Sequence, residues 1–230
     1  MEQLTLIQKL AVWVMPALLA ITVHEVAHGW MALRLGDRTA LMLGRLTLNP
    51  LKHIDPIGTV LLPALMLMIG GFVFGWAKPV PVTWENLRHP KRDMALVALA
   101  GPCANLLMAV LWLLAVKLGI QLSNGNPWLG LPLIYMGVAG IFINAILMVL
   151  NLLPLPPLDG GRIVAGLLPG PLSWQYSRIE PWGMLIVLAL FFTKLLGKIM
   201  WPVLSGFFLV LFYLGQLPSG LFESVLQAII

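Results

Sequence analysis

Long apolar runs separated by short polar segments dominate this sequence and leave few folds open to it. Hydrophobic residues make up 60% of the 230 residues and charged residues only 10%, against about 25% charged in soluble domains. In lipid, every backbone N–H and C=O must find a partner within the protein, so spanning elements are helices or closed barrels. Runs near 20 apolar residues match the length of a spanning helix. The sequence therefore predicts an all-α polytopic membrane protein with five to six transmembrane helices.

Charged residues, prolines and glycines divide the chain into its predicted spans. We interpret 1–230 as a single integral membrane domain, with apolar runs at 10–33, 93–118, 129–153, 181–192 and 201–217. Residues 39–50 are too few to span, and their alternating Thr, Leu and Met around Gly44 favour a short β-hairpin. The edge of this hairpin is hypothesised to hold an extended substrate as an added strand. A plain amphipathic linker is the alternative.

The apolar segment 57–74 is about long enough to cross the membrane, but its two flanks are equally basic. Residues 34–52 hold four Arg and Lys residues, and residues 75–92 also hold four. Positive residues collect on the cytoplasmic side of a membrane, so both flanks favour the same side. The segment is therefore predicted to be re-entrant, and a plain crossing is the alternative.

A polar cluster interrupts the first apolar run, where His24, Glu25 and His28 form the pattern H-E-x-x-H. Residues four apart share one face of a helix, so both imidazoles can bind one metal ion while Glu25 accepts a proton from a nearby water. Zinc takes neutral imidazole and carboxylate ligands and keeps a position open for catalysis. Ionisable residues within a span are costly and mark functional sites. Two helix-face histidines beside an interfacial glutamate are the alternative interpretation.

A catalytic zinc site needs a third protein ligand. Of the nine acidic residues, Glu25 and Asp159 are the two that lie in or against apolar runs. Asp159 closely follows the run 129–153, in the sequence Leu-Asp-Gly-Gly. It is the candidate third ligand, and a helix-breaking Asp-Gly turn is the alternative.

Three motifs together resemble the site-2 protease family of intramembrane zinc metalloproteases, in particular its short bacterial members without a PDZ or CBS domain. These motifs are HEVAH at 24–28, GPCAN at 101–105 and NLLPLPPLDGG at 151–161. The resemblance implies one zinc ion per chain, bound by His24, His28 and Asp159, with Glu25 as general base. It also implies that Asn151 hydrogen-bonds the substrate carbonyl or the developing oxyanion. The implied activity is regulated intramembrane proteolysis by a multi-pass protein of the cell membrane.

The three candidate ligands must meet at one depth, and this requirement constrains the topology. His24 and His28 lie in the C-terminal half of the first run, and Asp159 lies at the C-terminal end of the run 129–153. These two runs must therefore point the same way, which one intervening crossing allows and two forbid. Because 93–118 already crosses, this is a second reason to predict that 57–74 does not. The N-terminus is then outside and the metal nearer the cytoplasmic face.

Other polar residues receive structural interpretations. His53 and His89 are predicted to lie at the interface without ligand roles, Asn105 to pack or hydrogen-bond between helices, and Cys103 to be a packing residue. The predicted partners are the lipid bilayer and a membrane-spanning protein substrate, with no nucleic acid, and the oligomeric state stays open.

The alternative function is a membrane transporter or ion relay that uses the buried His, Glu and Asp. Two further rivals are an inactive relative, which the intact Glu25 argues against, and an unrelated membrane protease such as a prenyl-protein peptidase. The Asn-Pro-Pro-Asp-Gly element disfavours the latter.

Overall fold

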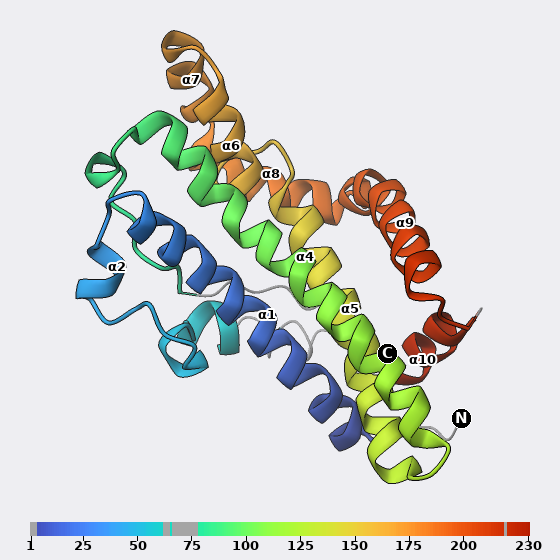
Figure 1. Ribbon diagram of the computed structural model, residues 1–230. Helices are drawn as coiled ribbons and strands as arrows, with labels where there is room; N and C mark the ends of the chain where they lie inside the picture. The colour runs from blue at the N-terminus through green and yellow to red at the C-terminus, as the bar shows by residue number, and fades with distance from the viewer. Residues whose placement is uncertain (1–3, 62–64, 66–77, 219) are drawn as a thin grey trace.

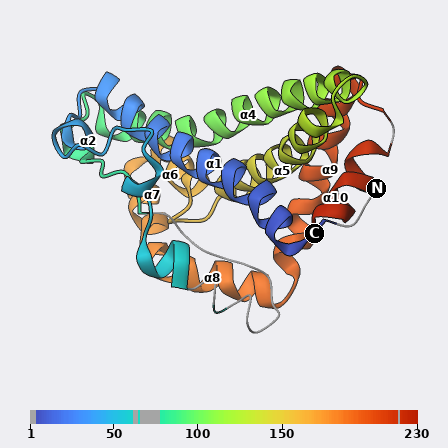
Figure 2. The ribbon, with the colours of Figure 1, turned by 90° about the horizontal axis from the view of Figure 1, so that it is seen from below.

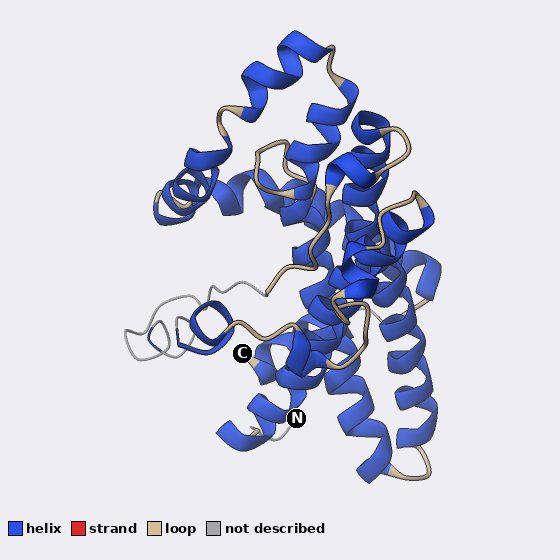
Figure 3. Cartoon of the chain, turned by 90° about the vertical axis from the view of Figure 1, so that its left-hand side faces the viewer, coloured by secondary structure: helices blue, strands red, loops and turns tan. Residues whose placement is uncertain are grey.

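Four long apolar helices form the body of the protein. The computed structural model describes residues 4–61, 65, 78–218 and 220–230, and within these ranges its regular elements are all helices (Figure 1; Figure 3). Four of them are long and apolar enough to cross a membrane, namely α1 (Leu6–Arg34), α4 (Pro90–Ser123), α5 (Pro127–Asn151) and α9 (Leu195–Gly215). The predicted helical membrane class is confirmed, whereas the predicted number of five to six spans exceeds the four found in the described residues.

The span predicted at 181–192 accounts for part of this difference. It corresponds to α8 (Glu180–Phe192), which has 13 residues. At 1.5 Å per residue such a helix is about 20 Å long, well short of the roughly 30 Å of a hydrocarbon core. Composition alone made this run look like a span, and its length excludes a full crossing.

Helix α1 begins and ends where its sequence places capping residues. At its start, the Thr5 hydroxyl accepts from the Gln8 N–H, and the Gln8 side chain accepts from the Thr5 N–H at 2.9 Å, which satisfies two backbone donors reciprocally. At its end, Gly36 adopts a φ of +117°, a conformation that glycine takes without steric cost. The helix therefore spans 29 residues without interruption and presents His24 and His28 from its C-terminal half.

Helices α4 and α5 pack closely because glycines line their contact. A Cβ atom at Gly137 of α5 would lie 2.5 Å from Cγ2 of Val116, and one at Gly140 would lie 2.5 Å from Cδ1 of Trp112. Small residues allow this close approach between helices in a membrane. The surrounding core is apolar and fully buried, with Val138 and Ile141 at 0% exposure.

The direction of the helices brings the candidate ligands to one end of the bundle. Helices α1 and α5 run the same way, and α4 lies against both in the opposite direction (Figure 1; Figure 2). The parallel direction of α1 and α5 is the one predicted from the requirement that His24, His28 and Asp159 meet at one depth. After α5, the chain turns through residues 152–158 into α6 (Asp159–Leu167), so Asp159 opens α6 beside α1.

Two glycines after Asp159 explain how the turn and α6 fit together. A Cβ at Gly160 would overlap the carbonyl oxygens of Leu152 and Leu153, and one at Gly161 would lie 2.5 Å from the carbonyl carbon of Leu155. The first turn of α6 therefore packs directly on the incoming backbone. The Leu-Asp-Gly-Gly sequence begins a helix here rather than breaking one.

The predicted β-hairpin at 39–50 is wrong. These described residues form the short helix α2 (Thr39–Met42), followed by a turn in which Gly44 has a φ of +62°, and the 3₁₀ turn Pro50–Lys52 begins at their end. The Asp37 carboxylate lies just before α2 and accepts from the N–H of Thr39 at 3.0 Å. The hypothesis of substrate addition to a hairpin edge at 39–50 falls with the hairpin.

Most of the predicted re-entrant segment 57–74 lies outside the described residues, and its described start belongs to a short π-helical turn, Pro56–Leu61. Its two flanks are in direct contact. The Lys78 N–H donates to the His53 carbonyl at 2.9 Å, and the Thr83 N–H donates to Asp37 at 2.8 Å. The basic flanks thus lie at the same end of the bundle, and a segment that returns between them stays a prediction.

Among the C-terminal elements, α9 (Leu195–Gly215) and α10 (Leu221–Ile229) pack against α5. After α6 follow α7 (Gly170–Ser177), α8, α9 and α10 (Leu221–Ile229). Helix α10 buries Phe222, Val225 and Ile229 in the same core. The Trp13 indole of α1 donates to the Ile229 carbonyl at 3.0 Å. The chain end is thereby bound to the start of the first span.

Candidate metal centre

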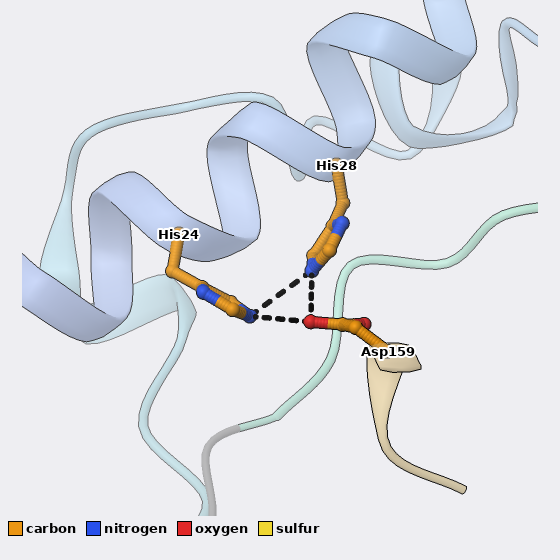
Figure 4. Close-up of side chains that lie close together, drawn as sticks. All are labelled: His24, His28 and Asp159. Atoms are coloured by element: carbon orange, nitrogen blue, oxygen red, sulfur yellow. Dashed lines mark hydrogen bonds and ion pairs between the residues drawn. The ribbon is translucent and has the colours of Figure 1, made fainter. Parts of the chain in front are cut away.

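Three side chains from two distant segments converge in the bundle. Nε2 of His24 lies 3.0 Å from Nε2 of His28, and both atoms approach Oδ2 of Asp159, at 3.2 Å and 3.3 Å (Figure 4). His24 and Asp159 are each 7% exposed. Among the described residues, these three form the group of His, Cys, Asp or Glu side chains that could hold a metal ion. The structure thus brings together the three residues that the sequence predicts as metal ligands, and their binding of a metal ion stays a prediction.

The separations fit zinc. Ligand atoms about 2.0–2.1 Å from a tetrahedral zinc ion stand roughly 3.3 Å apart, and the three observed separations are 3.0–3.3 Å. Oδ2 of Asp159 is buried and has no hydrogen-bond donor, although buried polar atoms are normally satisfied. A cation bound among the three atoms would satisfy it.

The hydrogen bonds behind the two rings set which nitrogen faces this group. Nδ1 of His28 lies 2.7 Å from the Val97 carbonyl, and a carbonyl can only accept, so Nδ1 carries the proton. Nδ1 of His24 lies 2.5 Å from Oδ1 of Asn105, which likewise accepts. In neutral imidazoles both Nε2 lone pairs are then free for a metal. Such partners behind the ring are usual for metal-binding histidines.

Glu25 lies next to this group on α1 but is turned toward the extended segment after residue 77. Its Oε2 accepts from the Val80 N–H at 2.7 Å. The fit between the two segments is close, since a Cβ at Gly29 would lie 2.8 Å from Cγ1 of Val80. Arg45 also holds this segment, because its guanidinium donates to the Lys78 carbonyl at 3.1 Å. Glu25 is therefore anchored through one carboxylate oxygen beside the histidines.

Asn151 is the last residue of α5, and its side-chain amide donates to the Leu147 carbonyl at 3.0 Å. The described structure places it at the end of the helix that leads to Asp159, without a recorded hydrogen bond to the three converging groups. Its role toward a substrate stays a prediction.

The other two histidines and the cysteine lie apart from the three converging groups. Nε2 of His53 lies 2.8 Å from the Thr47 carbonyl oxygen. The backbone N–H of His89 donates to the Asp93 carboxylate at 2.8 Å at the start of α4. Neither histidine joins the converging group. Cys103 is exposed on α4, which does not fit the packing role predicted for it.

Two residues of GPCAN touch the centre more directly than the sequence indicated. Asn105 was predicted to pack or hydrogen-bond between helices, and its partners include a candidate metal ligand, His24. Gly101 lies against both rings, because a Cβ there would be 2.6 Å from Cε1 of His24 and of His28. In the sequence, a polar amide within an apolar run was the feature that could have indicated a role for Asn105 near the centre. For Gly101 the sequence offered only its place in the GPCAN motif.

The two imidazoles lie on a membrane-length helix beside a glutamate, and the carboxylate joins them at zinc spacing from the start of the short helix α6. This arrangement is typical of the class of membrane zinc metalloproteases. Comparison with known proteins agrees, since residues 120–193 match peptidase family M50. The chain is 37% identical over 197 residues to the candidate zinc metalloprotease YwhC of Bacillus subtilis, covering 84% of this chain and 85% of that protein. The chain belongs to family M50, the site-2 proteases. It is accordingly a zinc-dependent intramembrane metalloprotease.

Two mycobacterial proteins are also similar. The candidate zinc metalloprotease Rip2 of Mycolicibacterium smegmatis is 33% identical over 192 residues, which cover 83% of this chain and 70% of Rip2. Rip2 of Mycobacterium tuberculosis is 30% identical over 196 residues, or 85% of this chain and 69% of that protein. No solved structure matches the chain. The transporter alternative is not favoured by these relationships.

Proposed function

We propose that the chain hydrolyses peptide bonds of membrane-spanning proteins at a zinc centre formed by His24, His28 and Asp159. The observation that carries this proposal is the convergence of two Nε2 atoms and Oδ2 within 3.0–3.3 Å of one another. When bound there, zinc would supply Lewis acidity toward the peptide carbonyl and make a water molecule more acidic. We further propose a multi-pass protein of the cell membrane, a single domain over 1–230 and one zinc ion per chain.

Glu25 is the proposed general base. It adjoins His24 in sequence, and the Val80 N–H fixes one of its oxygens. In the proposed reaction Glu25 accepts a proton from the attacking water, whose oxygen bonds to the carbonyl carbon. The C–N bond then breaks, and Glu25 returns the proton to the departing amine. The bond from the Val80 amide fixes one carboxylate oxygen, and the other oxygen is the proposed proton acceptor.

Asn151 is proposed to hydrogen-bond the substrate carbonyl or the oxyanion that develops from it. Its amide donates to Leu147 in the present structure, so engagement of substrate requires this donor to be redirected. Supporting this role is its place at the end of α5, directly before the turn that leads into Asp159.

The test is cleavage of a membrane-spanning substrate by purified protein in lipid vesicles. Glu25→Gln should retain zinc and lose activity by about 10²–10⁴-fold, the contribution typical of a general base. Glu85→Gln is the matched control, because Glu85 is exposed in the turn Trp84–Asn86, and it should cleave at the wild-type rate. Wild-type cleavage by Glu25→Gln would refute the proposed mechanism.

A further inference from the structure

Two asparagines are buried side by side within the membrane-spanning bundle. Asn105 of α4 is 1% exposed, and Asn144 of α5 is 0% exposed. An amide that is buried without partners costs several kcal/mol, so side chains of this kind in a membrane helix need a complete set of hydrogen bonds. Their bonds form one continuous chain that ends on a histidine of the metal centre.

Each bond in this chain has a fixed direction. Nδ2 of Asn144 donates to the Gly140 carbonyl at 2.8 Å, which turns Oδ1 of Asn144 toward Asn105. Nδ2 of Asn105 donates to that Oδ1 at 2.9 Å and to the Ala20 carbonyl at 3.4 Å. Because backbone carbonyls can only accept, neither amide can flip without placing oxygen against oxygen.

The chain therefore presents an acceptor to His24. Oδ1 of Asn105 lies 2.5 Å from Nδ1 of His24, so the proton must reside on Nδ1. A flipped Asn105 would present its NH₂ group and favour the other tautomer, with a proton on Nε2 facing the centre. In contrast, the orientation of His28 depends on the main-chain carbonyl of Val97. Of the two candidate histidine ligands, His24 is the one whose tautomer is fixed by a side chain rather than by the main chain.

We propose that Asn105 is a positioning residue that holds His24 in its metal-binding tautomer, and that Asn144 orients Asn105. This inference rests on the zinc centre proposed above. Its readout is the affinity of the purified protein for zinc, measured by competition with a chelator and without substrate. The absorption spectrum of the cobalt-substituted protein reports the ligand geometry in parallel.

Asn105→Leu removes the acceptor at similar volume and should weaken zinc binding about 10–100-fold, the range for loss of a partner behind a metal ligand. Asn144→Leu leaves the acceptor in place but frees it to flip, and should weaken binding by about tenfold. Asn105→Asp keeps an oxygen toward Nδ1 but sets its second oxygen against Oδ1 of Asn144, so it should weaken zinc binding less than Asn105→Leu does. Thr22→Val is the control, since it removes a buried hydroxyl from α1 and should leave zinc affinity unchanged.

The order of the variants separates positioning from packing. A residue that merely packs between apolar helices would tolerate Leu better than Asp, whereas the proposal requires Asp to bind zinc better than Leu. Wild-type zinc affinity and cobalt spectrum in Asn105→Leu would overturn the proposal. If this variant does not fold, wild-type affinity in Asn144→Leu overturns it. Failure of the proposed function appears instead as cleavage by Glu25→Gln, in a protein whose asparagines are intact.

Discussion

Gly101 offers a sharp test of the geometry around the metal centre. This residue of α4 faces both imidazoles, and a methyl group at its position would lie 2.6 Å from Cε1 of His24 and 2.6 Å from Cε1 of His28, with Nε2 of His28 closer still. Non-bonded carbon atoms prefer separations of about 3.5–4.0 Å. In Gly101→Ala, therefore, either the rings or helix α4 must move by about 1 Å.

The size of this displacement sets the expected effect. Metal–ligand distances hold to about ±0.2 Å, and a misplacement of about 1 Å at a catalytic centre can lower a rate about 10²-fold. We expect kcat/KM of Gly101→Ala to fall by about 100-fold, equivalent to about 2.7 kcal/mol of transition-state stabilisation. Overpacking should also lower the free energy of unfolding by about 1–3 kcal/mol.

The assay is cleavage of a membrane-spanning substrate by protein in vesicles, together with zinc content. Gly206→Ala is the matched control, because a Cβ at this position of α9 meets nothing within 4 Å. The control should keep wild-type activity and zinc content. If Gly101→Ala cleaves within threefold of wild type and retains its zinc, the close packing of α4 on the two rings is refuted.

Three further predictions test other parts of the structure. Asp159→Ala removes one of the three converging groups and should lose zinc in metal analysis of the purified protein; unchanged zinc content would exclude Asp159 as a ligand. Burial by itself would raise the pKa of Asp37, but hydrogen bonds from Thr39, Thr83 and Asn86 outweigh burial and lower this pKa. The ionised carboxylate therefore stabilises the folded protein above about pH 4, and this contribution is lost as the pH falls through the folded-state pKa. We expect Asp37→Asn to be about 1–2 kcal/mol less stable than wild type at pH 7 and to lose less stability on acidification, as measured by thermal unfolding at pH 7 and pH 3; an equal loss in both proteins would contradict this. Because the flanks of 57–74 are in contact, cysteines at exposed positions Leu43 and Glu85 in a Cys103→Ala background should react with an impermeant reagent from the same side of the membrane, and labelling from opposite sides would establish a crossing.

The contents of the metal centre were largely predictable from local sequence. The four-residue spacing of His24 and His28 places both on one helix face whatever surrounds the helix, and Asp159 was one of two acidic residues in or against apolar runs. The demand that these residues meet also predicted that α1 and α5 run in the same direction. Helix periodicity and membrane length are local properties, so they can be read without knowing the fold.

The errors concern segments whose structure depends on distant partners. Residues 39–50 alternate as a strand does, yet the chain forms α2 beside Asp37, which bonds to Thr39 and, across more than 40 residues, to Thr83. The run 181–192 has the composition of a span but not its length. Contacts between distant segments are not encoded in a local pattern, whereas the shortness of the run 181–192 was already visible in the sequence.

By itself, the sequence determined the helical membrane class, the histidine pair with its neighbouring glutamate, and the candidate third ligand. Only the tertiary structure decided how these groups are oriented: that Asn105 and the Val97 carbonyl hold the rings, that Gly101 gives them room, and that the Val80 amide anchors Glu25. Helical spacing specifies which residues share a face. Which atom of a neighbouring element meets that face depends on packing between segments that are far apart in the chain.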